Sequence, residues 1–177
     1  LLEGVPASEK NIKFTYSGGT PTADKQAGAM KDNWEKAGFK VTLNGLTDTY
    51  YDVIQNPKAD GDVFWGGWGS DWPSASTVIP ALFDSRLNLT EKSNGQDYGN
   101  YKSDEVNKMI DEAAKKTSVD EAGEVYKQID KKLGEDVAYI PLEIQKFYYL
   151  RGSKVTNYIN NPATSMYPDL GAVGVSK

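Results

Sequence analysis

Composition and charge already exclude several classes of function for this chain. Its 177 residues carry a formal net charge of −5, and neither cysteine nor histidine occurs among them. Nucleophilic sites of the Cys–His or Ser–His–Asp type, thiolate or imidazole zinc sites and disulfide bonds are therefore excluded. Because the basic residues are dispersed among acidic ones, neither nucleic acid nor an anionic membrane surface is expected as a partner.

The beginning of the chain predicts a fragment of a longer protein. The first ten residues, LLEGVPASEK, lack the basic start and the small-residue cleavage site of a signal peptide. They look like the end of a helix that begins upstream. The longest apolar run, Val78 to Phe83, is interrupted by Pro80 and is too short to span a bilayer.

The next stretch predicts a strand, a helix and a second strand. Residues 11–16 alternate apolar and polar side chains, which is the period of a half-buried strand, and residues 40–46 do the same. Between them, apolar residues recur at helical spacing over 23–37. Thr20 or Thr22 is suited to cap this helix.

The same rhythm then continues with a further helix and strand. A short helix is predicted over 49–55, and an uninterrupted apolar strand over Val63–Trp65, as expected where both faces of a strand are covered. The order β-α-β-α-β is typical of an open α/β sheet. In such sheets ligands bind beyond the carboxyl ends of the strands, and the turn that follows Trp65 occupies such a position.

The second half of the chain predicts a helix hairpin. Residues 84–103 are rich in Asn, Ser, Gly and Asp and are interpreted as a surface loop. Helices are predicted over 104–116 and 119–134 from their apolar faces. Ser103 and Ser118 precede these helices as N-caps.

The last part of the chain predicts extended structure. Residues 135–152 predict a strand, a proline and a second β-rich run, whereas residues 153–177 contain turn residues with little periodicity and are interpreted as an arm. The fold class expected from these elements is α/β, with an open sheet, flanking helices and a β-rich C-terminal segment.

The turn after the third predicted strand carries the residues best suited to binding a small ligand. It combines glycines that leave backbone groups accessible, indole rings and one carboxylate. The candidate ligand-binding residues are Gly67, Trp68, Gly69, Ser70, Asp71 and Trp72.

Asp71 has two interpretations that the sequence leaves open. A carboxylate beside tryptophans is costly to bury unpaired, so it should have a cationic or hydrogen-bond-donating partner, and the ammonium group of a ligand is one candidate. Alternatively, Asp71 caps the helix that is predicted to begin near Ser74. Both roles could be shared.

The aromatic and glycine residues of the turn also divide into scaffold and candidate site. Trp65 lies inside the predicted strand and is expected in the core. Trp68 and Trp72 either contact a ligand or form a local core under the loop. The glycines do not match a phosphate-binding loop, because no Lys-Ser/Thr pair follows and the G-x-G-x-x-G spacing is absent. Their better use is close backbone approach to an extended ligand.

Two pairs of neighbouring carboxylates are interpreted as solvated turn charges. They are Asp60 with Asp62, and Glu135 with Asp136. Neither pair lies in an aromatic pattern typical of a catalytic cleft, and no EF-hand spacing is present. We therefore expect no catalytic residue, no metal site and no cofactor.

Several segments together resemble one protein family. The stretch GGWGSDWPSASTVIPALF (66–83) contains a Gly-Trp, an Asp near a proline and a helix ending in Leu-Phe. The segments YKSDEVNKMIDEA (101–113), VYKQIDKKLGEDVAYIPL (125–142) and SKVTNYINNP (153–162) follow in the family's order. The chain thereby resembles the C-terminal portion of the family 5 extracellular solute-binding proteins of ABC importers, of the oligopeptide- and dipeptide-binding type.

The resemblance implies a fold and a function. It implies one lobe of a periplasmic-binding-protein type II-like fold, with residues 1–140 as a ligand-facing lobe and 141–177 as a return segment toward the other lobe. By motif position, Asp71 matches the residue that receives a peptide's ammonium group, and residues 67–69 match the strip that borders the peptide. The sequence Trp-Pro-Ser after Asp71 departs from many members, which have Asn or acidic residues there.

The resemblance further implies where such a protein acts and with what. The expected partners are a peptide or other small-molecule ligand and the permease subunits of an ABC transporter. The expected protein is a monomer outside the cytoplasm, held at the membrane only through a lipid anchor upstream of this chain. Because members of the family also bind metal chelates or oligosaccharides, either remains an alternative ligand for the Trp68/Trp72 turn.

Overall fold

The computed structural model describes residues 2–142, 146, 148–161 and 167–176, which fall into two units. One unit contains residues 1–67 and 85–102, and the other contains 68–84 and 103–177. The predicted division at residue 140 concerns two lobes of a longer protein, and it stays a prediction.

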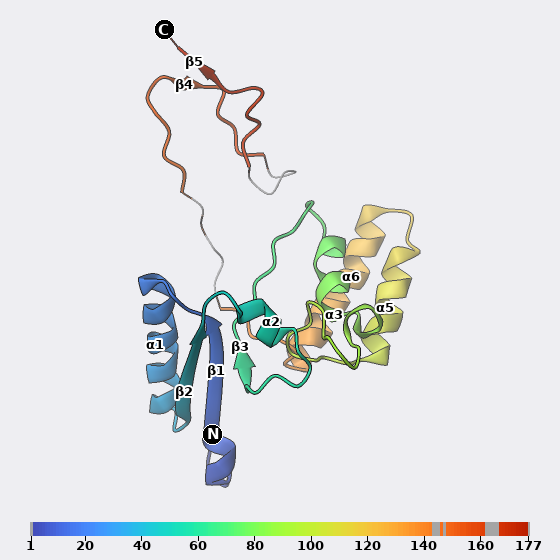
Figure 1. Cartoon of the computed structure of the whole chain (residues 1–177). Helices are drawn as coiled ribbons and strands as arrows, with labels where there is room; N and C mark the ends of the chain where they lie inside the picture. The colour runs from blue at the N-terminus through green and yellow to red at the C-terminus, as the bar shows by residue number, and fades with distance from the viewer. Residues whose placement is uncertain (1, 143–145, 147, 162–166, 177) are drawn as a thin grey trace. The chain divides into compact units, whose positions relative to one another are not determined.

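A small parallel sheet organises the first unit. Strand β1 (Asn11–Ser17) lies in the middle, between β2 (Lys40–Leu46) and β3 (Val63–Phe64), and pairs with both in parallel. Helices α1 (Pro21–Lys36) and α2 (Tyr50–Ile54) connect the strands in sequence. Figure 1 shows α1 alongside β1 and β2. The predicted β-α-β-α-β order is confirmed.

Local sequence signals place the ends of α1. The Thr20 hydroxyl oxygen accepts a hydrogen bond from the Ala23 N–H at 3.2 Å, so Thr20 is the N-cap, and Pro21 occupies the first turn. Gly38 follows the helix with a φ of +104°, a conformation that favours glycine. Residues 2–10, before β1, contain a 3-10 helix, η1 (Ala7–Lys10), and no α-helix, although the sequence predicts a helix end there.

Both faces of the sheet are covered. On the face that carries α1, the buried cluster contains Phe14, Tyr16, Ala27 and Val41. A second buried cluster contains Tyr50, Ile54 and Tyr98. The neighbouring residues Val63 and Phe64 of β3 pack against different clusters, Val63 on the first and Phe64 on the second. This arrangement explains the uninterrupted apolar pattern of that strand.

The interpretation of residues 84–103 as a surface loop is right in that residues 89–103 contain no helix or strand, but wrong in that part of the segment is buried. The segment contains a short helix, α4 (Ser85–Asn88), and the side chains of Asn94 and Asp97 are buried at 1% and 3% exposure. The Asn94 side chain donates a hydrogen bond to the Ile54 carbonyl at 3.0 Å. A polar composition is typical of a solvated loop, but these side chains form hydrogen bonds with backbone groups inside the unit.

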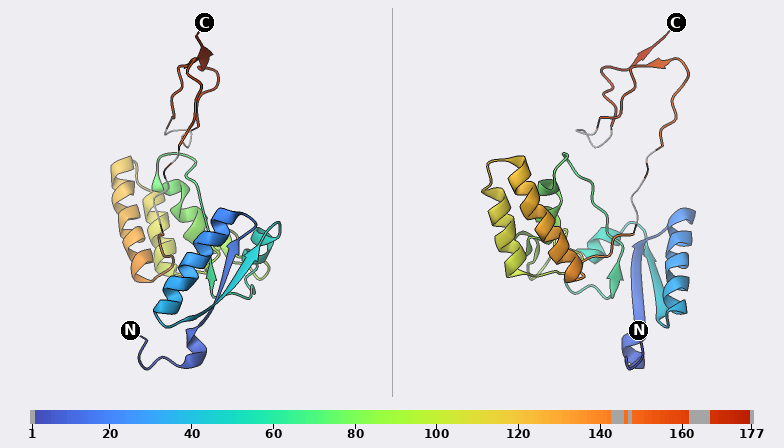
Figure 2. Two further views of the ribbon diagram at one scale, coloured as in Figure 1. Left: turned by 90° about the vertical axis from the view of Figure 1, so that its left-hand side faces the viewer. Right: turned by 180° about the vertical axis from the view of Figure 1, so that it is seen from behind.

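A helix hairpin dominates the second unit. It consists of α5 (Asp104–Ala114) and α6 (Val119–Glu135), which pack on each other and contact α3 (Ile79–Phe83) and the 3-10 helix η2 (Ala75–Thr77). Figure 2 shows the two long helices side by side. Ser118 caps α6 as predicted. The buried residues of the hairpin are Val106, Asn107, Ile110, Ala113, Val125, Tyr126, Ile129 and Leu133.

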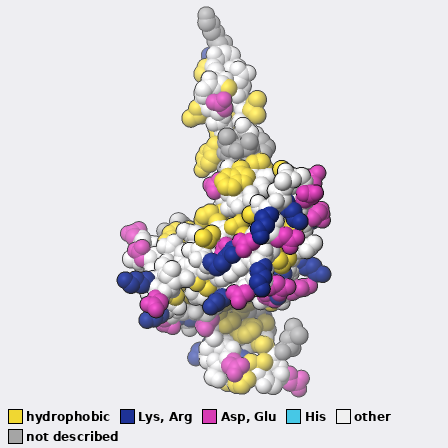
Figure 3. Space-filling model, turned by 90° about the vertical axis from the view of Figure 1, so that its right-hand side faces the viewer, with side chains coloured by type: hydrophobic (Ala, Val, Ile, Leu, Met, Phe, Trp, Pro, Cys, Tyr) yellow, Lys and Arg dark blue, Asp and Glu magenta, His cyan; other side chains and the backbone are white. Residues whose placement is uncertain are grey.

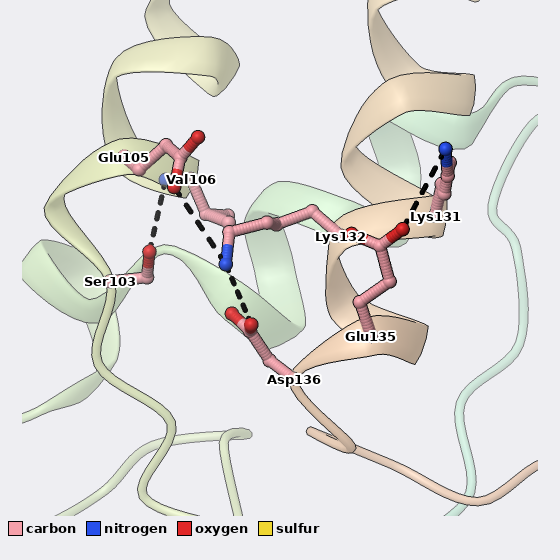
Figure 4. Close-up of polar contacts among 7 residues, drawn as sticks. All are labelled: Ser103, Glu105, Val106, Lys131, Lys132, Glu135 and Asp136. Atoms are coloured by element: carbon pink, nitrogen blue, oxygen red, sulfur yellow. Dashed lines mark hydrogen bonds and ion pairs between the residues drawn. The ribbon is translucent and has the colours of Figure 1, made fainter.

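Figure 4 shows polar contacts at the ends of the two helices, including an ion pair that joins them. The Ser103 hydroxyl accepts a hydrogen bond from the Val106 N–H at 3.2 Å and caps α5. The Lys132 ammonium lies 2.6 Å from an Asp136 carboxylate oxygen and 3.7 Å from a Glu105 oxygen on the facing helix. These ion pairs are partly solvated, so packing of the apolar faces provides more of the stability.

The predicted strand within residues 135–152 is wrong where the chain is described. Helix α6 continues to Glu135, and residues 136–142, 146 and 148–152 are irregular. The remainder of that prediction falls on residues 143–145 and 147, outside the described residues. Further along, β4 (Val155–Thr156) and β5 (Gly174–Val175) form a small antiparallel pair.

The surface has mixed charge and no membrane-spanning element within the described ranges. None of the helices there has both the length and the apolar character that crossing a bilayer requires. On the face drawn in Figure 3, basic side chains lie among acidic ones. That face therefore presents no patch of a single sign.

The core of the hairpin gives a first prediction. Ile129 is fully buried, whereas Val119, on the same helix, is 81% exposed. We expect Ile129→Ala to lower the free energy of unfolding by about 2–5 kcal/mol, because it removes packed methyl groups. The matched control Val119→Ala should change it by less than about 0.5 kcal/mol. Urea unfolding followed by circular dichroism measures the free energy of unfolding of both variants. Equal losses in the two variants would contradict the placement of Ile129 in the hairpin core.

The Asp97 carboxyl group gives a second prediction. Burial raises its pKa from 3.8 to about 6, against the opposing effect of hydrogen bonds from the Gly99 and Tyr101 N–H groups. The folded chain therefore binds more protons than the unfolded chain between about pH 4 and pH 6, and stability falls as pH rises through this window.

Replacing Asp97 by Asn removes the charge and keeps a hydrogen-bond acceptor. We expect Asp97→Asn to be more stable than the native chain at pH 7 by about 1–3 kcal/mol, and to have lost most of that advantage near pH 4. Urea unfolding at the two pH values measures this difference. An advantage of the same size at both values would show that the Asp97 charge is not its cause.

Candidate functional site

The candidate stretch, residues 67–72, begins just beyond the carboxyl end of β3. The Trp65 N–H donates to the Thr15 carbonyl at 3.1 Å, which extends the pairing with β1, and the Tyr50 hydroxyl donates to the Trp65 carbonyl. Burial raises the pKa of Tyr50, which keeps that hydroxyl a donor. The boundary between the two units falls between Gly67 and Trp68.

The residues just before the stretch belong to the scaffold. Trp65 packs on the first buried cluster and stacks on Phe14, with ring centroids 6.3 Å apart, so its predicted core position is confirmed. At Gly66 a Cβ atom would lie 2.9 Å from the Tyr98 ring.

The two glycines inside the stretch are open. At Gly67 and Gly69 a Cβ atom would meet no described heavy atom within 4 Å. Packing within the described chain therefore explains glycine only at position 66.

Trp68 and Trp72 are half-exposed, at 40% and 51%. Their ring nitrogens are nevertheless held. Trp68 Nε1 donates to the Thr77 carbonyl at 3.1 Å, and Trp72 Nε1 donates to the Ser76 hydroxyl at 3.0 Å. Both indoles are thus fixed at one edge and partly open to solvent, and their contact with a ligand stays a prediction.

The Asp71 carboxylate is exposed, and it pairs with a hydroxyl group. The Thr77 hydroxyl donates to Asp71 Oδ2 at 3.0 Å, while its oxygen accepts a hydrogen bond from the Asp71 N–H at 3.1 Å. The expected donor partner is therefore found, although the carboxylate is not buried. No hydrogen bond to Oδ1 and no ion pair of Asp71 occurs with another residue in the described part of the chain.

The alternative role of Asp71 as a helix cap is wrong. Ser74 is the N-cap: its hydroxyl oxygen accepts hydrogen bonds from the Ser76 N–H at 3.2 Å and from the Ser76 hydroxyl at 3.0 Å. The predicted helix is also divided into η2 and α3, with Pro80 in the first turn of α3. Ser74 immediately precedes η2, so a residue three positions further upstream is not needed as its cap.

Sequence reasoning missed Thr77, which contacts two of the six candidate residues. Thr77 is 3% exposed and interacts with both Trp68 and Asp71. The available signal was a cluster of hydroxyl residues, Ser74 to Thr77, directly after the candidate stretch. Ser70, the remaining candidate residue with a side chain, is exposed.

The paired carboxylates have structural partners. Asp60, whose side chain is 90% exposed, lies 2.6 Å from the Lys13 ammonium, and Asp62 accepts a hydrogen bond from the Lys13 N–H at 2.7 Å. Asp60 and Asp62 thus hold the loop before β3 against β1. The interpretation of Asp62 as only a solvated turn charge is therefore incomplete, because it also bonds to the backbone of β1. Across the described ranges, no three acidic residues gather in a group that could hold a metal ion.

The second unit also contains an open groove of about 480 Å³. It runs between residues 73–79 and helix α6, and its lining includes Tyr126, Lys127 and Asp130. Of the six candidate residues, none lines it. The groove is thus separate from the Asp71 carboxylate.

Comparison with known proteins identifies relatives of the chain. Residues 2–89, which include all six candidate residues, match the family described as bacterial extracellular solute-binding proteins, family 5 Middle. The probable D,D-dipeptide-binding periplasmic protein DdpA of Escherichia coli K12 is 28% identical over 160 residues. That match covers 89% of this chain and 30% of DdpA.

Solved structures show the same fold. The clavulanic acid biosynthesis oligopeptide binding protein 2 superposes with a TM-score of 0.80 at 20% identity, covering 95% of this chain and 31% of that protein. The E. coli murein tripeptide binding protein MppA superposes with a TM-score of 0.72 at 21% identity, covering 94% of this chain and 31% of that protein. The chain thus spans less than a third of the length of these relatives.

Proposed function

The chain belongs to the family 5 bacterial extracellular solute-binding proteins, and we propose that it forms part of a protein that captures peptides for an ABC importer. In this proposal Asp71 receives the ammonium group at the amino terminus of the peptide. The protein delivers its ligand without chemical turnover, so it is not an enzyme.

The observation that carries the proposal is the state of the Asp71 carboxylate. Its Oδ2 atom is held by the Thr77 hydroxyl, while the side chain remains exposed to solvent. One oxygen is therefore fixed and the other is available to a donor from outside the described chain. An ammonium group supplies such a donor together with a complementary charge.

The neighbouring residues support an extended ligand. The open space beside Gly67 and Gly69 lets a second backbone approach their N–H and C=O groups. The ring of Trp68, fixed through its nitrogen to the Thr77 carbonyl, offers an apolar wall in the same turn. A peptide presents an ammonium group, backbone hydrogen-bonding groups and side chains, and it matches all three features.

The proposal extends to the setting of the whole protein. Residues 1–140 would form a ligand-facing lobe and 141–177 a return segment toward a second lobe that this chain does not include. The partners would be the peptide and the permease subunits of the importer. We propose a monomer outside the cytoplasm, attached to the membrane only through a lipid anchor upstream of Leu1.

An oligosaccharide is the second candidate ligand, with a metal chelate as a further variant. The observation that favours a sugar is the pair of half-exposed indoles, Trp68 and Trp72, each held through its ring nitrogen. Such rings can stack on sugar faces. A sugar needs no receptor for an ammonium group, so the role of Asp71 distinguishes the two ligands.

The ammonium role predicts the effect of Asp71→Asn in the complete protein that contains this chain. Calorimetry with alanine peptides of two to five residues measures binding of the free-amine and the N-acetylated forms. We expect the substitution to lower the affinity for free-amine peptides by about tenfold to a hundredfold, because a charged hydrogen bond is lost. The weak binding of N-acetylated peptides should change little.

A matched variant and a second ligand class complete this experiment. Asp32→Asn alters an exposed carboxylate of α1 and should leave peptide affinity unchanged. Unchanged affinity of Asp71→Asn for free-amine peptides would reject the ammonium role. Binding of oligosaccharides but of no peptide would instead support the second candidate.

The chain covers less than a third of the length of its relatives, and this gives a further prediction. Closure of two lobes contributes ligand contacts from both sides. We therefore expect residues 1–177 alone to bind the same peptides at least about a hundredfold more weakly than the complete protein, since two sets of contacts become one. Calorimetry compares the two proteins. A dissociation constant below about 1 μM for residues 1–177 would contradict the prediction.

A further inference from the structure

We propose that Thr77 is a positioning residue that orients the Asp71 carboxylate and thereby makes the site selective for a free amino terminus. This inference rests on the proposed function, because it concerns how Asp71 would meet the ammonium group. Thr77 itself is 3% exposed and does not need to touch the ligand.

The first argument is the double hydrogen bond between the two residues. The Thr77 hydroxyl accepts from the Asp71 N–H at 3.1 Å and donates to Asp71 Oδ2 at 3.0 Å. One hydroxyl thus holds both the backbone and the side chain of Asp71. An exposed aspartate otherwise samples several rotamers, and a ligand that requires one of them must offset the lost freedom.

The second argument is that Thr77 has a fixed position of its own. Its N–H donates to the Ser74 carbonyl at 3.2 Å, and its carbonyl accepts from Trp68 Nε1 at 3.1 Å. A β-branched side chain also has restricted rotation about its Cα–Cβ bond. Thr77 therefore links the proposed receptor, Asp71, with the proposed wall, Trp68, through short contacts within residues 68–77.

The geometry has a consequence for selectivity. The Thr77 hydroxyl donates to Oδ2, and no described residue donates to Oδ1. The ammonium donor is then directed to Oδ1 in a defined orientation. Without the hydroxyl, the carboxylate keeps its charge but loses its orientation, so the preference for a free amine over an N-acetylated terminus should shrink while other contacts persist.

The test uses four variants of the complete protein: Thr77→Val, Thr77→Ser, Asp71→Asn and the double variant Asp71→Asn/Thr77→Val. Calorimetry with the same alanine peptides, free and N-acetylated, gives the selectivity ratio of each. We expect Thr77→Val to lower the affinity for free-amine peptides about threefold to tenfold. The affinity for N-acetylated peptides should be nearly unchanged. Thr77→Ser should restore the native ratio, because it keeps the hydroxyl.

The double variant separates orientation from general stability. If Thr77 acts through Asp71, adding Thr77→Val to Asp71→Asn should produce little further loss of free-amine binding. Equal additional losses for both peptide forms would mean a structural role alone and would overturn the inference. Thr42→Val, at an exposed position of β2, is the matched control and should leave the ratio unchanged.

The outcomes also distinguish this inference from the proposed function. If Asp71→Asn abolishes the preference for free amines but Thr77→Val does not, only the positioning role of Thr77 fails. If Asp71→Asn leaves the preference intact, or if no peptide binds the native protein, the ammonium role fails and the inference with it. Should Thr77→Val not fold, Thr77→Ala is measured in its place with the same expectations.

Discussion

The pairing of β1 with a parallel strand on each side is the constraint on which the first unit depends. It brings the carboxyl ends of β1, β2 and β3 to one edge of the sheet, and both faces of the sheet are then buried by apolar clusters. Trp65 extends the pairing by one residue, and Tyr50 holds its carbonyl group. The chain therefore leaves the sheet at a defined point, immediately before the candidate stretch.

Polar contacts hold the exposed side chains of the candidate stretch. Trp68, Asp71 and Trp72 are exposed, and each is held by a hydrogen bond to Ser76 or Thr77. Hydrogen bonds of this kind contribute only about 0.5–1.5 kcal/mol each to stability, but they restrict orientation. A site that is already arranged pays less entropy when a ligand binds. Exposed rings and a fixed carboxylate are what a receptor for a small extended ligand requires.

Family membership and local geometry contribute different parts of the functional argument. The family comparisons concern the fold and the class of protein, since this chain spans less than a third of its relatives' length. The residues proposed to meet a ligand are argued instead from the contacts of Asp71 and Trp68 and from the open backbone at Gly67 and Gly69. Thr77, a buried residue outside the candidate stretch, forms hydrogen bonds with both Asp71 and Trp68.

The sequence by itself determined the regular elements. Periodicity and caps predicted β1, α1, β2, α2, β3 and the α5–α6 hairpin, because a buried face repeats every two or every 3.6 residues and helix ends require polar caps. Composition misled for residues 84–103, where polar side chains are buried and bind backbone groups, and for the strand expected within 135–142.

Only the tertiary structure decided the state of Asp71. A cap and a ligand receptor require the same residue type, and a hydrogen bond to a residue six positions away leaves no periodic signal. In the structure Ser74 is the N-cap, and the Thr77 hydroxyl is the partner of Asp71. The turn folds back on itself and brings the Asp71 and Thr77 side chains together.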